Sequence, residues 1–259
     1  MIPLLVSLVA AQGAAQAPCE GWMTEQFWRT ADPPTVRECL AAGYSVHDRT
    51  PSWNVTSLHL AARYADDAGV ISVLVEAGAD LEASSRPAFR TPLHQAARFN
   101  ENPEVVRALL EHGADVHAVN QPGRTPLHLA ALFNDNPAVV EELARVTYVN
   151  ATMLDGRTPL HDAARRLPDD ELTGLPNPRV AEVLIRQGAD LSAKALGATP
   201  AGWAEDRRVV DMIREEESRR AAIRERFLRD IATRVAVGSL GLGLLGYLLA
   251  RRRQTRSRP

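Results

Sequence analysis

A four-residue motif, Thr-Pro-Leu-His, recurs along this chain at nearly constant spacing and constrains its fold more than any other feature. Complete copies begin at Thr91, Thr125 and Thr158, and the close relative Thr-Ser-Leu-His begins at Thr56. The copies start roughly 33 to 35 residues apart, and a pair of alanines follows each of them. A period of this length predicts an array of similar small units, each packed against its neighbours.

Each unit is typical of a turn, a helix, a short connection and a second helix. Thr is a good N-cap, Pro is favoured at the first helical position, and Leu and the alanines are suited to packing against neighbouring helices. In one unit the second helix carries Val105, Val106, Leu109 and Leu110, and it ends at Gly113. Glycine is the usual residue for a left-handed helix C-terminus. The motif residues therefore have structural explanations.

These motifs resemble the ankyrin repeat family over residues 25–217. The resemblance implies an all-α ankyrin repeat solenoid with β-turn fingertips, followed here by a stalk helix and a transmembrane helix. We expect repeats at 56–90, 91–124, 125–157 and 158–198, between an N-terminal strap and capping repeat at 18–55 and a C-terminal capping repeat at 199–217. The repeat at 158–198 has a loop inserted between Ala164 and Val180, where function is often found.

The first 17 residues are predicted to be a secretory signal peptide. Ile2 to Ala11 is an apolar run, and the alanines at 15 and 17 offer small residues for cleavage. No basic residue precedes the run, and Pro18 disfavours cleavage after Ala17, so cleavage after Ala15 is also open. The alternative is an N-terminal helix of a cytosolic protein.

Residues 235–250 are predicted to be a membrane anchor. They contain no charged residue, follow a charged stalk helix at 218–234, and precede a basic tail at 251–259. As a helix they would span about 24 Å of a hydrocarbon core of about 30 Å, so a few residues before them would complete the crossing. The alternative is a buried C-terminal helix.

The predicted anchor has a small-residue face. Its members include Ala236, Ser239, Gly243 and Gly246. Small residues permit close helix packing in lipid, so homodimerisation is one interpretation and chance is the other. The segment also resembles C-terminal sorting signals of bacterial surface proteins, although no Pro-Glu-Pro or Gly-Gly signature precedes it.

The two cysteines, Cys19 and Cys39, both lie near the start of the mature chain. In an oxidising compartment such a pair predicts a disulfide. The alternative role of Cys39 is a small buried hydrophobe on a second helix.

These signals together predict a location. Lys194 is the only lysine, and with the abundant alanine this is typical of a GC-rich bacterial genome. We expect a single-pass protein of the bacterial inner membrane, with the ankyrin domain in the periplasm and the C-terminus in the cytoplasm. The alternative is a tail-anchored cytoplasmic adaptor with free thiols.

A partner-binding surface is expected on the groove of the solenoid. The residues after each alanine pair end the first helix, and an arginine precedes the Thr of three motifs. The candidates are Arg63, Tyr64, Arg98, Phe99, Phe133, Arg165 and Arg166 from the first group, with Arg90, Arg124 and Arg157 from the second. Aromatic and arginine side chains dominate interface energetics, so we expect a protein partner with acidic and apolar side chains. Alternatively, the aromatics pack under the connections and the arginines pair with acids of adjacent turns.

Other classes of function are disfavoured. The motif histidines, His59, His94, His128 and His161, repeat too far apart to share a metal, and in the family such a histidine holds the turn by hydrogen bonding. No nucleophile, base and oxyanion site occur together, and Asp155 and Asp162 have turn and helix-surface explanations. A net charge of -2 disfavours nucleic acid as a partner. We expect a non-catalytic interaction scaffold without cofactors; an inhibitor or immunity-type module that blocks an enzyme is the alternative.

Overall fold

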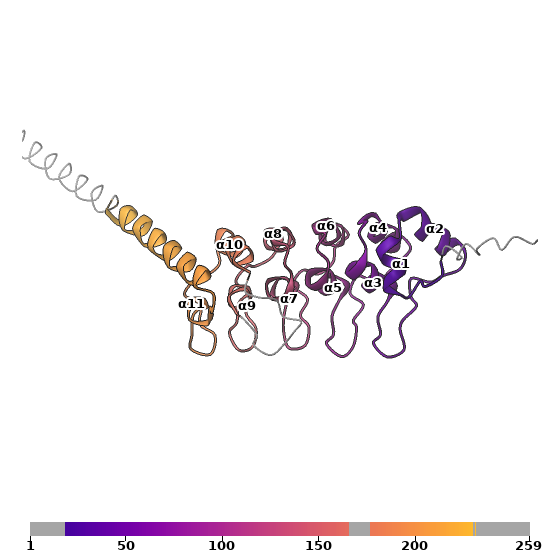
Figure 1. The fold of residues 1–259 in the computed structure, drawn as a ribbon, viewed down its shortest axis with the longest axis horizontal. Helices are drawn as coiled ribbons and strands as arrows, with labels where there is room; N and C mark the ends of the chain where they lie inside the picture. Colours follow the sequence, from indigo (N-terminus) through magenta and orange to yellow (C-terminus); the bar gives the residue numbers. More distant parts are fainter. Residues whose placement is uncertain (1–18, 166–176, 230, 232–259) are drawn as a thin grey trace, which may run out of the picture. The chain divides into compact units, whose positions relative to one another are not determined.

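The computed structural model describes residues 19–165, 177–229 and 231, and it confirms the predicted repeat solenoid (Figure 1). The chain divides into two compact units, residues 1–210 and 211–259. The helices are α1 (Glu25–Thr30), α2 (Pro33–Ala41), α3 (Ser57–Tyr64), α4 (Gly69–Glu76), α5 (Pro92–Phe99), α6 (Pro103–Glu111), α7 (Pro126–Phe133), α8 (Pro137–Val146), α9 (Pro159–Ala164), α10 (Pro178–Arg186) and α11 (Pro200–Trp203). A further helix covers residues 207–229.

The helices of the first unit form two rows. In the inner row α1, α3, α5, α7, α9 and α11 contact one another in that order, and in the outer row α2, α4, α6, α8 and α10 do the same. Five finger loops join each outer helix to the next inner helix, and all five extend to one side of the helices (Figure 1). Within the described residues, strand pairing is limited to three isolated antiparallel bridges across fingers: Arg49 with Thr56, Ser85 with Arg90, and Ala195 with Ala198.

The core runs along the stack between the two rows. The motif leucines, Leu58, Leu93, Leu127 and Leu160, are completely buried, and the alanine pairs beside them are buried as well. Burying each leucine contributes about 1.5–3 kcal/mol, and the small alanines let adjacent inner helices approach closely. The repeated motif therefore builds a continuous apolar core from short helices.

The motif threonine and histidine hold each inner helix to the next finger. Thr91 donates its backbone N–H to His94 Nδ1 at 3.3 Å, and His94 Nε2 donates to the Arg124 carbonyl at 3.0 Å. His59 and His128 make the same bonds to the carbonyls of Arg90 and Arg157. The hydrogen-bonding role expected for these histidines is thus confirmed, and burial lowers the pKa of His59, His94 and His128 to about 4.

Asparagines connect the repeats at the other end of the inner helices. Asn100 Nδ2 donates to the carbonyls of Ala62 and Ala65, and Asn134 Nδ2 donates to those of Ala97 and Asn100. These bonds satisfy carbonyls that a helix terminus leaves without partners. They were not anticipated from the sequence, although the repeated Asn-x-Asn-Pro pattern before α6 and α8 marks them.

The N-terminal strap is fixed to α2 by a disulfide. Cys19 and Cys39 are bonded, with their Cα atoms 5.4 Å apart, and both side chains are buried. Trp22 packs beside them in an aromatic cluster with Phe27, Trp28 and Tyr44. The cluster supplies apolar cover for the first repeat of the stack.

The helix at 207–229 runs unbroken through the boundary between the predicted capping repeat and stalk. Arg220 pairs with Glu216 at 2.9 Å and Arg229 with Glu225 at 3.8 Å, as expected for residues one turn apart. None of the helices within 19–165, 177–229 and 231 is long and apolar enough to cross a membrane. The predicted signal peptide, the anchor at 235–250 with its small-residue face, the basic tail and Arg166 lie outside the described residues.

Candidate functional site

The ends of α3, α5 and α7 place arginine and aromatic side chains in alternation along the stack. The Arg63 guanidinium lies 3.7 Å from the centroid of the Phe99 ring, and Arg98 lies 3.7 Å from that of Phe133. Arg63 is also 4.9 Å from the centroid of the Tyr64 ring, and Arg29 lies 5.3 Å from the same centroid. We call these residues the arginine–aromatic ladder: Arg29, Tyr64, Arg63, Phe99, Arg98 and Phe133. Each step is a cation–π contact, and Arg29 is also paired with Glu25 at 2.8 Å.

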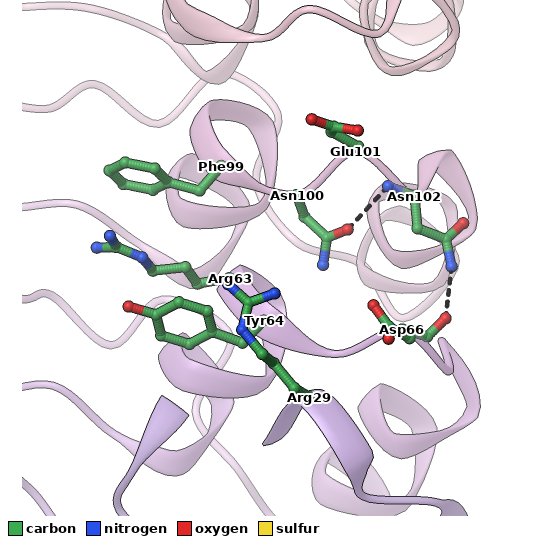
Figure 2. Close-up of a pocket in the computed structure, with 8 residues that line it drawn as sticks. All are labelled: Arg29, Arg63, Tyr64, Asp66, Phe99, Asn100, Glu101 and Asn102. Atoms are coloured by element: carbon green, nitrogen blue, oxygen red, sulfur yellow. Dashed lines mark hydrogen bonds between the residues drawn. The ribbon is translucent and has the colours of Figure 1, made fainter. Parts of the chain in front are cut away.

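The ladder borders a hollow of about 560 Å³ (Figure 2). Figure 2 shows the Arg63 side chain between the rings of Tyr64 and Phe99, with Arg29 beside Tyr64. At the other end of the hollow, Asn102 donates to the Asp66 carbonyl at 2.8 Å. The lining residues are Arg29, Arg63, Tyr64, Asp66, Phe99, Asn100, Glu101 and Asn102. The hollow thus combines aromatic surface, two arginines, two acidic residues and two asparagines.

The second predicted column, Arg90, Arg124 and Arg157, divides into two environments. Arg157 is only 8% exposed; its Nε donates to Asp155 at 2.7 Å, and its Nη1 lies 3.5 Å from Asp162. Arg124 Nε lies 3.9 Å from the other oxygen of Asp162. Arg157 is therefore held by acids of the solenoid itself, as the alternative interpretation of the sequence proposed. Arg124 lies near Asp162, but its Nε has no hydrogen-bond acceptor among the described residues.

The position of the Asp162 side chain differs from the prediction. The sequence analysis placed it on a helix surface, but its side chain is completely buried because α9 carries it on the inner face toward Arg124 and Arg157. Burial raises the pKa of Asp162 to about 6, although the two guanidinium charges act to lower it. Asp155 does have the expected turn role, since it accepts from the Arg157 backbone N–H at 3.1 Å.

Arg63 and Arg90 have no such acid. No carboxylate of the described residues lies within 4.0 Å of either guanidinium, and the Nε of each is buried without a hydrogen-bond acceptor. Burial lowers the pKa of Arg90, and the charges of Arg63 and Arg124 lower it further. Arg90 therefore lies close enough to Arg63 and Arg124 to be repelled by both, whereas Arg124 is also attracted by Asp162 and Asp155.

At the C-terminal end of the stack, the arginine at the end of the inner helix lies beside a tryptophan. Arg165 lies 5.4 Å from the ring of Trp203, which α11 places one repeat further along, and Trp203 Nε1 donates to the Ala195 carbonyl. Trp203 was missed by the sequence analysis. Aligning the last repeat from Thr199 would have shown it at the position that Asp162 occupies in the preceding repeat.

Comparisons with known proteins agree with this architecture. The family model for ankyrin repeats in three copies matches residues 29–120 and 93–195. The solved structure of the ankyrin repeat domain of Bcl-3, described as a unique member of the IkappaB protein family, is similar with a TM-score of 0.58 and 32% sequence identity. The similarity covers 73% of this chain and 80% of that one. The comparison with curated proteins found no match.

Proposed function

Because this chain belongs to the ankyrin repeat family, whose members are non-enzymatic interaction domains, we propose that it is a membrane-anchored scaffold that binds an acidic segment of a protein partner. The segment lies along the arginine–aromatic ladder and places carboxylates beside Arg63 and Arg90. The observation that carries the proposal is that both arginines lie within a surface of half-buried aromatic rings, with their Nε atoms buried and without a hydrogen-bond acceptor among the described residues.

The energetics favour such a partner. An isolated guanidinium that has lost part of its hydration gains from a carboxylate, because charge-assisted hydrogen bonds are stronger than neutral ones. The stacking on Phe99 and Phe133 orders the ladder before binding, which reduces the entropy lost in the complex. Apolar side chains between the carboxylates would cover the rings of Tyr64 and Phe99.

The proposed site occupies the N-terminal half of the stack. Arg63 and Arg90 lie in this half, whereas Arg124 and Arg157 lie beside Asp162. A partner carboxylate at Arg157 would have to displace a buried ion pair, which is costly. We therefore assign Arg157 to the stability of the stack.

Peptide selection tests this site. Two displayed libraries are compared on the immobilised full chain, one rich in Asp, Glu, Phe and Leu and the other rich in Lys, Arg, Phe and Leu. The acidic library should be enriched, and the dissociation constant of a selected peptide should rise at least about tenfold with Arg63→Glu and Arg90→Glu together. The control, Arg37→Glu with Arg179→Glu, makes the same change in net charge on the outer helices α2 and α10.

Two outcomes of the selection would contradict the proposal. Enrichment of the basic library, or an equal loss of affinity in the outer-helix control, would remove the ladder as an acidic-peptide site. Thermal unfolding of both double variants is compared with that of the unmodified chain, so that loss of the fold is not mistaken for loss of binding.

For the location, we propose that the repeats lie in the periplasm and that residues 235–250 anchor the chain in the bacterial inner membrane, where their small-residue face permits a homodimer. The buried Cys19–Cys39 disulfide supports export, since such bonds persist in oxidising compartments. To test this, the N-terminal residue of the protein is identified after isolation from host membranes. Alkylation of its cysteines is measured without reductant. A start at Gln16 or Pro18 with blocked cysteines supports export; an intact Met1 with free thiols favours the tail-anchored cytoplasmic adaptor.

A further inference from the structure

Each of the five finger loops carries an exposed apolar side chain. These side chains are Trp53, Phe89, Val119, Leu154 and Leu196, with exposed fractions of 58%, 51%, 61%, 100% and 77%. They come from five successive repeats, and the fingers extend to the same side of the helices (Figure 1). Single exposed apolar residues are common on protein surfaces, but one on every finger of a row is a pattern that needs an explanation.

Two of these residues occupy backbone conformations that favour glycine. Phe89 and Leu196 both have φ of 50°. In the next two fingers the residue at the position of Phe89 is Gly123 or Gly156, with φ of 97° and 83°. A bulky side chain in the left-handed region is an outlier, so glycine would be the less strained residue at Phe89. Strain retained at an exposed apolar residue points to a role outside the fold.

The first fingers are also fixed to one another. The Arg86 backbone N–H donates to the Trp53 carbonyl at 2.7 Å, and the Gln121 N–H donates to the Ala88 carbonyl at 3.0 Å. The spacing of these tips is therefore set by the packing of the repeats, at about 8–10 Å for adjacent helices. The exposed apolar side chains are therefore separated from one another by polar backbone, and hydrogen bonds between adjacent fingers hold the first of them in place.

Two of the fingers carry an exposed positive charge near the apolar side chain. Arg86 and Lys194 are exposed beside Phe89 and Leu196, and neither forms an ion pair with an acid in the described parts of the chain. Asp155, which follows Leu154 in the sequence, is paired with Arg157 at 2.7 Å. The surface that meets the fingertips should therefore be apolar with negative charge at its boundary.

We propose that the fingertip row, Trp53, Phe89, Val119, Leu154 and Leu196, enters the interface of an anionic bilayer. A fluid interface accommodates isolated side chains at any spacing, and Trp and Phe are favourable there, whereas a protein would need a matching pocket for each tip. Arg86 and Lys194 would contact the anionic headgroups. This activity is separate from the ladder, and the proposed anchor would supply a nearby bilayer.

A label at one fingertip tests the proposal in the full chain. Leu154→Cys is labelled with a nitrobenzoxadiazole fluorophore, the two native cysteines being joined in a disulfide. The matched control is Val146→Cys, which is 55% exposed at the end of α8. Both proteins are added to phosphatidylcholine vesicles with or without phosphatidylglycerol, and quenching by brominated lipid is measured. Both proteins carry the same C-terminal segment, and a background in which three other tips are replaced separates insertion of the tips from insertion of that segment.

The expected result is severalfold stronger quenching at position 154 than at position 146, with phosphatidylglycerol present. The difference should disappear in the background Trp53→Ser, Phe89→Gly, Leu196→Gly, and should decrease in vesicles without anionic lipid. Equal quenching of the two labels, or quenching at 154 that does not depend on the other tips, would overturn the proposal. Peptide binding by the ladder is not involved in this readout, so the two proposals can fail independently.

Discussion

The guanidinium of Arg63 lies over the ring of Phe99, a residue one repeat further along the chain, at 3.7 Å from the ring centroid. Arg98 repeats the relationship with Phe133 at the same distance. The contact therefore follows the period of the solenoid, because equivalent positions of adjacent inner helices are neighbours. It orders arginine side chains across successive repeats.

The Arg63–Phe99 contact should have a measurable coupling energy. Arg63→Met and Phe99→Leu keep much of the apolar volume and remove the cation or the ring. In a double-mutant cycle, the free energy of unfolding should show a coupling of about 0.5–1 kcal/mol. Urea unfolding measures it. The control cycle combines Arg179→Met on α10 with Phe99→Leu, and the effects of these two substitutions on the free energy of unfolding should be additive.

The stability of the stack should decrease in acid because of the motif histidines. Burial lowers the pKa of His59, His94 and His128 to about 4, below the ordinary value of 6.5. Between these pH values the unfolded chain binds protons that the folded chain does not, so the free energy of unfolding falls as the pH drops from 6.5 to 4. The loss is roughly 3 kcal/mol for each histidine. Urea unfolding at several pH values measures the loss, and a flat profile across this range would contradict it.

Asp162 should have the opposite effect on the pH dependence of stability. Its pKa is raised from 3.8 to about 6, so the folded chain holds a proton that the unfolded chain loses, and stability falls as the pH rises between these values. Asp162→Asn removes this opposing effect. The rise in the free energy of unfolding between pH 4 and 6 should become steeper by up to about 1.4 kcal/mol per pH unit. The same urea series measures it.

Asp162→Asn should also extend the peptide-binding surface from Arg90 to Arg124, because it removes the carboxylate that faces Arg124. An acidic peptide selected on the unmodified chain should bind severalfold more tightly to the variant at neutral pH. Fluorescence anisotropy with the labelled peptide measures this. Unchanged affinity would place Arg124 outside the peptide's reach.

Phe89→Gly should stabilise the protein. The left-handed conformation costs a non-glycine residue about 1–2 kcal/mol, and part of this gain is offset by the flexibility of glycine in the unfolded chain. We expect a net increase of about 1 kcal/mol in the free energy of unfolding. Val119→Gly, also on a finger but without a positive φ, is the control and should destabilise. If both variants lose stability, the strain assigned to Phe89 is absent.

Breaking the disulfide should weaken the N-terminal repeat. The bond closes a loop with a sequence separation of 20 residues, for which the stabilisation is about 3 kcal/mol. Cys19→Ser with Cys39→Ser should lower the urea midpoint, and reductant should lower that of the unmodified chain by a similar amount. Reductant should have no effect on the double variant.

The sequence alone determined the repeat architecture, because its signals are local. Thr91 and Pro92 begin a helix, Gly113 ends one, and His94 bonds within a short reach of its own motif. The same period predicted where Arg63, Phe99 and Arg90 would lie. Each of these inferences needs only the register of one repeat against the next.

Tertiary structure decided which of these side chains are buried and which have a partner of opposite charge. Asp162 looks like a surface residue along its own helix, and its burial follows from arginines contributed by other fingers. Trp203 joins Arg165 only because α11 packs beside α9. The strained Phe89 and the row of fingertips likewise depend on backbone geometry and on the alignment of successive loops. A periodic sequence determines position along the stack, whereas burial and charge balance arise from contacts between repeats whose residues differ at equivalent positions.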